Sequence, residues 1–188
     1  FAQTDLVWLQ GFGIGYAGTN GEHVGSTTNT QLPTFKTPGQ QNFFSYATGA
    51  FSNGKLTRSN PEAWFYFNNF GVLADYIEEQ QDVKLGAVTG RLKNKALDVS
   101  GSWVLTGENV GYKGGVKPAH DFNIDGSGWG ALELTSRYGY TDVDDKAFTL
   151  GFASINTSAS MATSSGVGLA WYLSANLKLI ADWDTTKF

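Results

Sequence analysis

The segment from Met161 to Phe188 alternates residue types with a period of two, and no other feature of the chain limits the fold as strongly. In its first half the odd positions are bulky and apolar, namely Val167, Leu169, Trp171 and Leu173. After a break at residues 174–176 the alternation resumes, with Leu177, Leu179, Ala181 and Trp183 opposed to Lys178, Asp182 and Asp184. Successive side chains of a β-strand point to opposite faces, so the pattern predicts a hairpin with one apolar and one polar face. Water-soluble sandwiches and membrane barrels both contain such hairpins.

The same alternation recurs along the chain and predicts about eight strands in all. The other strands are expected at Leu6–Tyr16, Phe43–Phe51, Thr57–Phe67, Phe70–Thr89, Leu97–Leu105 and Leu132–Tyr140. Short connections are expected at Asn53-Gly54, which favours a primed hairpin turn, at Asn68-Asn69 and at the basic segment Arg91–Lys95. Long loops are expected at Gly18–Gln40, Gly107–Gly126 and Asp142–Ser160. Short and long connections therefore tend to alternate, as they do at the two ends of a membrane barrel.

The polar faces favour a barrel over a sandwich, because they are too polar to fill a sandwich core. They include Asp98, Ser100, Ser102, Glu133, Thr135 and Arg137. No apolar run approaches the roughly 20 residues of a spanning helix, and a closed barrel is the other structure that spans a membrane. We therefore predict an all-β fold, a transmembrane antiparallel β-barrel, with residues 1–188 as a single and incomplete barrel domain. A soluble sandwich remains the alternative from the pattern alone.

Several function classes are disfavoured by composition. A net charge of −4, from 13 basic and 17 acidic residues, gives no general attraction to nucleic acid. The absence of cysteine removes disulfides and thiolate chemistry. His23 and His120 stand alone in expected loops, and no serine lies in a Gly-x-Ser-x-Gly motif. We expect no enzyme activity, no catalytic residue, no metal site and no cofactor.

Five ordered segments resemble the outer-membrane phosphate-selective porin O and P family. They are Gln31–Tyr46, Phe70–Tyr76, Trp103–Glu108, Gly128–Tyr138 and Gly166–Leu173. The resemblance implies a barrel of 16 strands, usually trimeric, of which this chain is the internal to C-terminal half. It also implies a bacterial outer-membrane location. In one respect the chain departs from the family, whose phosphate-selective members line the pore with a ladder of arginines: Phe1–Leu56 contains no arginine, only Lys36 and Lys55.

We predict a porin, a passive diffusion channel for small solutes and ions, with an anion or phosphate preference as the resemblance implies. The pore-lining candidates are Lys36, Arg58, Glu62, Arg91, Asp98, Glu133, Arg137 and Lys178. Lys36 is expected to set selectivity, because Pro33 and Pro38 stiffen its loop and Phe35 can anchor that loop on the inner wall. Expected partners are outer-membrane lipid and lipopolysaccharide, small anions or other small solutes, and two further copies in a homotrimer. The alternatives are a structural or adhesin-like outer-membrane barrel and a soluble all-β carbohydrate-binding module.

Overall fold

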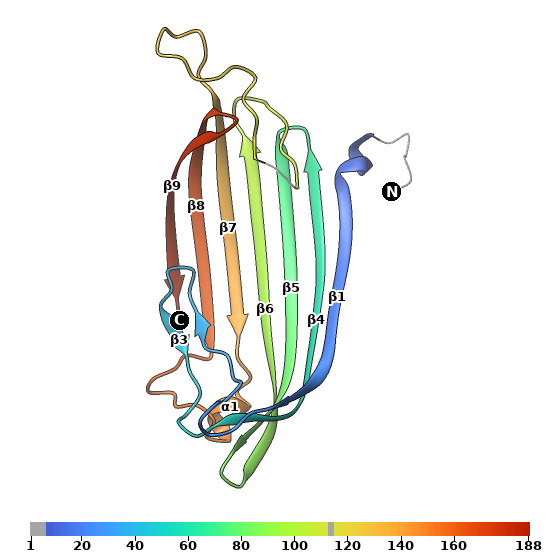
Figure 1. The fold of residues 1–188 in the computed structure, drawn as a ribbon, viewed down its shortest axis with the longest axis vertical. Coiled ribbons are helices and arrows are strands. Elements are labelled where there is room, and N and C mark those ends of the chain that lie inside the picture. The colour runs from blue at the N-terminus through green and yellow to red at the C-terminus, as the bar shows by residue number, and fades with distance from the viewer. Residues whose placement is uncertain (1–6, 113–114) are drawn as a thin grey trace.

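The computed structural model describes residues 7–112 and 115–188, which form one large antiparallel sheet and one small one. The large sheet has seven strands in the order β1-β4-β5-β6-β7-β8-β9 (Figure 1). These strands are β1 (Phe12–Val24), β4 (Phe51–Phe67), β5 (Phe70–Leu85), β6 (Val88–Val104), β7 (Ala131–Asp142), β8 (Met161–Ser174) and β9 (Leu177–Lys187). The small sheet pairs β2 (Phe35–Lys36) with β3 (Asn42–Phe44). Two short helices complete the fold, the 3-10 helix η1 (Val7–Gly11) and α1 (Lys146–Thr149).

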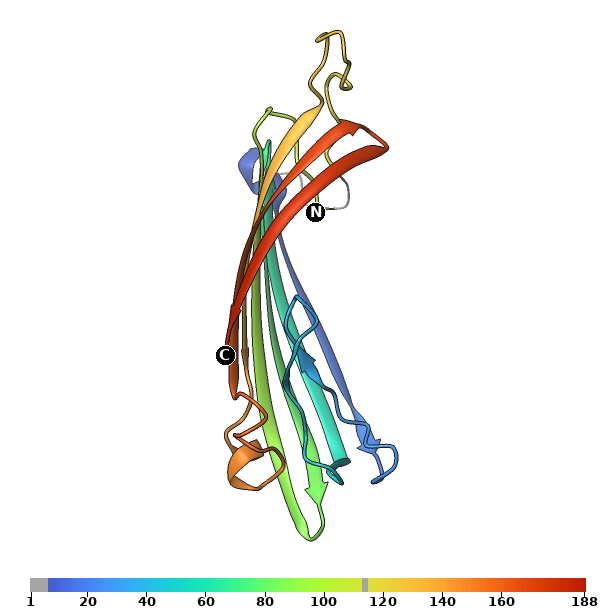
Figure 2. The same cartoon turned by 90° about the vertical axis from the view of Figure 1, so that its left-hand side faces the viewer.

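The large sheet is curved and open, with β1 and β9 as its two edges (Figures 1 and 2). The small sheet lies on the concave side of this curve, as Figure 2 shows. The prediction of an all-β antiparallel sheet is confirmed, whereas the described residues do not close it into a barrel. No helix in residues 7–112 and 115–188 has both the length and the apolar character needed to cross a membrane.

The register of the large sheet separates an apolar convex face from a polar concave face. Consecutive strands pair residue by residue, so side chains of one row share a face. One such row runs Ala74, Val99, Tyr138 and Ser165 on the convex side. The next row runs Asp75, Asp98, Gly139 and Ser164 on the concave side, where the small sheet lies. The alternation predicted for Leu97–Leu105, Leu132–Tyr140 and the last hairpin thus matches the two faces.

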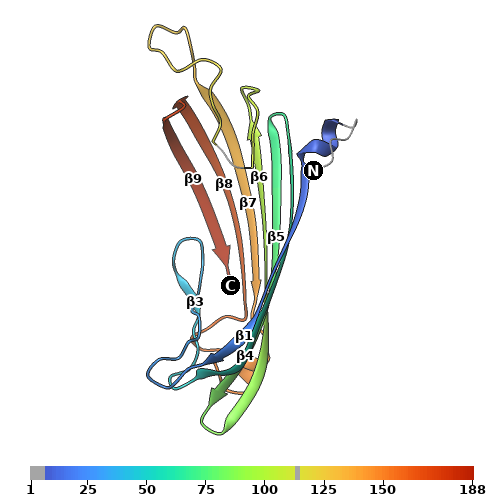
Figure 3. The ribbon, with the colours of Figure 1, turned by 45° about the vertical axis from the view of Figure 1, so that its right-hand side comes forward.

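The strands extend further than their apolar residues, and this makes two predicted connections wrong. Strand β1 continues to Val24, where a loop was expected from Gly18, because its polar second half pairs with β4 throughout. The basic segment Arg91–Lys95 lies within β6, and the chain turns at Gly86, whose φ is +59°. The polar ends of β5 and β6 form the hairpin that projects below the other strands in Figure 3. Polar side chains outside an apolar zone carry no face pattern, so the neighbouring backbone decides their structure.

Three further predictions differ from the structure near the chain's first third. Asn53-Gly54 lies inside β4 at a register shift, not in a hairpin turn. There Gly54 has a φ of +140°, and the Asp82 carboxylate accepts the Lys55 N–H at 2.9 Å. The strand expected at Phe43–Phe51 is limited to β3, because the chain turns inward between the two sheets. The strand expected from Leu6 begins at Phe12; residues 7–11 are helical and Leu6 lies outside the described residues.

Two buried clusters lie on the concave side, at opposite ends of the large sheet. The larger one joins β3 and the segment around α1 to the sheet. Its members are Phe43, Phe44, Ala50, Val83, Leu92, Val143, Ala147, Phe152, Ala153 and Ala162. The smaller one lies under the long connection between β6 and β7, and consists of Val104, Val116, Ala131, Ala170 and Tyr172. Both clusters fasten a connection onto the concave face.

Candidate functional site

The connection between β1 and β4, residues 25–50, folds onto the concave face and is called the inward segment below. Phe43 and Phe44 are buried against Phe152, and the Phe35 ring packs on both, with centroids 6.3 and 5.5 Å away. Aromatic pairs in such stacked and tilted arrangements add about 0.5–1.5 kcal/mol to the stabilisation from area burial. The expectation that Phe35 anchors Lys36 agrees with this packing, but Phe43 and Phe44 contribute the buried rings.

Hydrogen bonds from the β7–β8 connection hold the inward segment in place. The Ala47 N–H donates to the Phe152 carbonyl at 2.7 Å, and the Ala159 N–H donates to the Phe43 carbonyl at 2.8 Å. The Ser158 hydroxyl bonds both the N–H and the carbonyl of Ser45, each at 3.1 Å. Burial raises the pKa of Tyr46 to about 12 in the same region. The inward segment therefore has a fixed position and is not a mobile surface loop.

A cavity of about 460 Å³ lies between the tip of the inward segment and the concave face. Lys36, Thr37, Pro38 and Gln40 line it from the segment. Asp75, Asp98, Gly139, Arg137, Thr141 and Ser164 are among the residues that line it from the sheet. A tight turn supports the tip, because the Gln40 N–H donates to the Thr37 carbonyl at 2.9 Å. No ion pair to Lys36 forms within residues 7–112 and 115–188, so its ammonium group is free to act on solutes.

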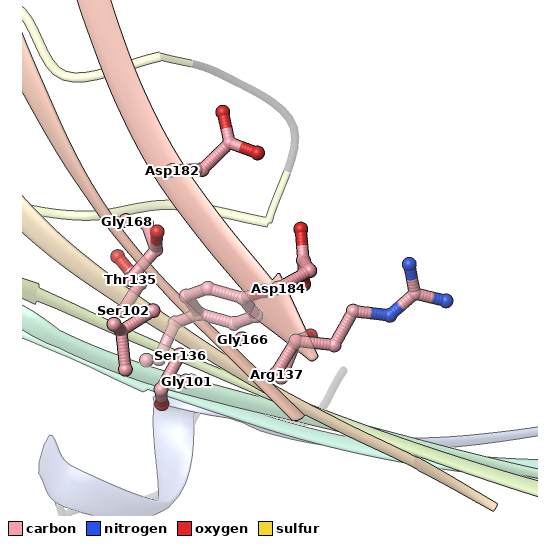
Figure 4. A pocket seen from close by; sticks show the side chains of 13 residues that line it. Gly101, Ser102, Thr135, Ser136, Arg137, Gly166, Gly168, Asp182 and Asp184 are labelled. Atoms are coloured by element: carbon pink, nitrogen blue, oxygen red, sulfur yellow. The ribbon is translucent and has the colours of Figure 1, made fainter. Parts of the chain in front are cut away.

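A second hollow of about 360 Å³, called the central trough below, continues along the concave face (Figure 4). Hydroxyl groups and glycines form its floor, including Ser100, Ser102, Thr135, Gly166 and Gly168. Asp182 and Asp184 of β9 stand along one side of it in Figure 4. A Cβ at Gly166 would clash with Oδ1 of Asp184, so a larger residue would displace that carboxylate. Arg137 and Tyr66 line the trough as well, so it presents hydroxyl groups together with charged groups of both signs.

Both arginines of the concave face are held by carboxylates. Nε of Arg58 lies 2.5 Å from Oε2 of Glu79, which is buried, and Nε of Arg137 lies 2.6 Å from Oδ2 of Asp98. Charge-assisted pairs of this kind are shorter and stronger than neutral hydrogen bonds. Each pair brings a positive and a negative group together on the face, so neither pair adds net charge.

Further along the same face, Glu133 accepts hydrogen bonds from the hydroxyls of Ser102 and Tyr172. The bond from Tyr172 is 2.7 Å long. The Lys178 ammonium lies 5.4 Å from the centroid of the Tyr172 ring, within cation–π range. These four side chains form a fixed polar group, which joins the smaller buried cluster through Tyr172.

The structure places seven of the eight predicted site residues on the concave side. Lys36 reaches it from the inward segment, and the strands carry Arg58, Glu62, Asp98, Glu133, Arg137 and Lys178. Arg91 does not join them. It alternates onto the convex side of β6, where it pairs with Asp82 at 3.8 Å and donates to Gln80 at 3.2 Å.

Sequence reasoning passed over several other charged groups of the concave face as site residues. They are Asp75, Glu79, Asp182 and Asp184. The alternation of Asp75, Asp182 and Asp184 with bulkier or apolar neighbours was a usable signal, whereas Glu79 stands between Glu78 and Gln80 and shows no alternation. No group of His, Cys, Asp or Glu in the described part of the chain has the geometry to hold a metal ion.

A curved antiparallel sheet with an apolar convex face and a charged, partly filled concave face is the arrangement of a porin wall. The family description "Phosphate-selective porin O and P" matches residues 11–185, which is most of the chain. No curated protein matches the chain. The chain therefore belongs to the phosphate-selective porin O and P family.

Proposed function

We propose that the chain forms part of an outer-membrane porin, a passive channel for small solutes and ions. One observation supports this most directly. The inward segment narrows the concave side of the sheet and leaves a cavity lined by charged and hydroxyl groups. A channel needs such a polar constriction, where solutes interact with the wall weakly enough to leave again. The apolar convex face is then the lipid contact.

The open edges of the sheet indicate that further strands complete the channel. In a bilayer, the unpaired N–H and C=O groups of β1 and β9 would each cost several kcal/mol. Closure by further strands removes both edges, and the family leads us to expect a 16-stranded barrel. A homotrimer in the bacterial outer membrane, in contact with lipid and lipopolysaccharide, is part of the same proposal.

The alternatives receive less support. No second sheet covers the convex face within residues 7–112 and 115–188, so a soluble carbohydrate-binding sandwich does not fit. A purely structural or adhesin-like barrel gains nothing from the polar constriction. The anion or phosphate preference rests on the family's description and on Lys36 alone.

Planar-bilayer recording of the complete barrel protein tests the proposal. Stepwise conductance increases are expected on insertion, whereas a folded barrel that gives no steps would refute a channel. A variant lacking residues 37–40 provides a second measurement, since it removes the tip of the inward segment that narrows the concave side. We expect that variant to conduct more per step than the parent protein. An unchanged conductance would place the constriction elsewhere.

A further inference from the structure

The central trough combines an aromatic ring, hydroxyl groups and charged groups of both signs on one surface. Tyr66 of β4 lines it together with Arg137 of β7 and with Asp182 and Asp184 of β9. Sites for small organic ligands have volumes of roughly 300–1,000 Å³ and combine aromatic surface with a few placed polar groups. The trough, at about 360 Å³, has this size and this mixture of groups. A bare inorganic anion would use only part of it.

A glycine lets the Tyr66 ring lie close to the wall. Gly71 is the partner of Tyr66 across β4 and β5, and a Cβ at Gly71 would clash with the ring. On its other flank the ring contacts Tyr112 of the β6–β7 connection at a steep angle, with centroids 6.0 Å apart, and Tyr112 in turn stacks on Trp64. The Tyr66 ring therefore has a fixed position in the trough and offers an apolar surface to the C–H groups of a sugar ring.

The two carboxylates of β9 suit a solute that carries hydroxyl groups. Asp182 and Asp184 form no hydrogen bond or ion pair within residues 7–112 and 115–188. Both stand along one side of the trough in Figure 4. An ionised carboxylate only accepts hydrogen bonds, so these groups repel a bare anion and attract hydrogen-bond donors. The hydroxyl groups of a sugar are such donors.

Arg137 supplies the contact for an anionic group. Its Nε donates to Asp98 at 2.6 Å, while its two terminal nitrogens have no hydrogen-bond partner in the described part of the chain. Terminal guanidinium nitrogens bind phosphate oxygens, and compensation by Asp98 keeps that contact weak enough for release. Arg137 also lines the cavity of Lys36, so a phosphate bound there faces a second cation.

The strand register places these two kinds of group one row apart. Tyr66 and Asp182 belong to one row of the concave face, and Arg137 and Asp184 belong to the next. Rows on one face are two residues apart, or about 7 Å along the strands. In a hexose 6-phosphate the exocyclic carbon and the ester oxygen span most of this distance. A solute lying along the channel can thus place its ring at the first row and its phosphate at the second.

We propose that the central trough is a transit site for sugar phosphates. In this site Tyr66 contacts the sugar ring, Asp182 and Asp184 accept hydrogen bonds from its hydroxyl groups, and Arg137 contacts the phosphate. The inference rests on the proposed channel function and specifies its solute class, which includes phosphate monoesters of sugars beside inorganic phosphate.

Block of the KCl current by an added solute tests the inference in single-channel recordings of the complete protein. The three probes are glucose 6-phosphate, glucose and inorganic phosphate. We expect glucose 6-phosphate to reach half-block at a concentration about tenfold below that of either other probe, because it alone makes both kinds of contact. Equal half-blocking concentrations of glucose 6-phosphate and inorganic phosphate would overturn the inference and leave the porin function intact. A folded protein without conductance overturns the porin function itself.

Removal of the β9 carboxylates separates sugar recognition from charge. Asp182→Asn, Asp184→Asn should raise the half-blocking concentration of glucose 6-phosphate about fivefold, because neutral acceptors bind hydroxyl groups less strongly. The same variant should lower the half-blocking concentration of inorganic phosphate, because two negative charges are lost. The matched control Glu22→Gln, Asp142→Asn removes two convex carboxylates and should change neither value. Shifts in the same direction for both solutes would contradict the role of the carboxylates in binding hydroxyl groups.

Two substitutions of Tyr66 test the ring contact and do not depend on the folding of the β9 variant. Tyr66→Leu keeps an apolar side chain without the flat ring, and should raise the half-blocking concentration of glucose 6-phosphate about fivefold while that of inorganic phosphate stays the same. Tyr66→Phe keeps the ring and should retain the parent value. Equal shifts in the two variants would refute the contact between Tyr66 and the sugar.

Discussion

Val167 offers the sharpest test of which face meets lipid. It lies on the convex side of β8, between Ser136 of β7 and Trp183 of β9, and 55% of its surface is exposed. The apolar part of this face spans five rows, from the row of Trp171 to the row of Tyr140. Val167 belongs to the third of these rows. We choose Val167→Arg because this residue is at the centre of the proposed lipid contact.

The expected loss of folding free energy in Val167→Arg follows from the depth of this residue in the membrane. Four steps between rows span about 27 Å along the strands, and a tilt of roughly 40° reduces this to about 21 Å along the membrane normal, close to the apolar band of such barrels. Val167 is then about 10 Å from either interface, near the midplane. Arginine on the lipid face at the midplane costs about 2–4 kcal/mol.

Ser164→Arg is the matched control, because Ser164 belongs to the same strand and to the concave face. Its neighbours in the sheet are Gly139 and Thr186, so the new side chain has room and faces water. We expect a cost below about 1 kcal/mol there, as for other exposed sites. Urea unfolding of the complete protein in phospholipid vesicles, followed by tryptophan fluorescence, measures both changes. Equal costs, or a larger cost at Ser164, would refute the assignment of the two faces.

Three further predictions concern the concave side. Lys36→Glu should move the reversal potential in a salt gradient towards cations, with a shift that shrinks as salt rises, while Lys187→Glu on the convex edge should do less. Arg58→Met should destabilise the protein by about 1–3 kcal/mol, because it leaves the buried Glu79 carboxylate without its cation; adding Glu79→Gln should restore most of that loss in the same urea assay. Tyr46→Phe should flatten the loss of stability at alkaline pH: the pKa of Tyr46 is raised above its ordinary value of 10 to about 12, so its favourable contribution is complete below pH 10 and is lost as the pH rises through 12. A wild-type stability curve that matches the Tyr46→Phe curve over this pH range would contradict that assignment.

The faces of the strands were predictable from the sequence because a pleated strand has a period of two. Asp98 and Arg137 lie on the polar side of their strands whatever the rest of the chain does, and the structure pairs them across β6 and β7. Strand ends were not predictable in the same way. Outside the apolar rows, as at Lys93, Asn94 and Lys95, a polar residue follows another polar residue and no alternation marks the faces. Pairing with a neighbouring strand extends β1 and β6 there, and local propensity does not report that pairing.

The inward position of Lys36 shows how far local reasoning reaches. Two prolines and a phenylalanine predict a stiff segment with an apolar anchor, and the structure agrees. The direction of folding, however, depends on the contact of the Phe44 ring with the Phe148 ring, which is more than 100 residues away in the chain. No local pattern encodes a partner at that separation.

The same limit applies to the sign of the charge on the concave face. Arg58 and Arg137 were counted among the pore-lining candidates, and as isolated cations they would favour anions. In the structure each is bound to a carboxylate, at 2.5 Å and 2.6 Å. Each guanidinium is bound through its Nε, and the carboxylate compensates its charge, which weakens the attraction of the arginine for phosphate. The concave cations without a carboxylate partner in the described part of the chain are then Lys36 and Lys178, and the carboxylates of this face without a hydrogen bond or ion pair there are Glu62, Asp75, Asp182 and Asp184. The preference of the channel follows from which charges remain unpaired, and pairing depends on strand register, which composition does not contain.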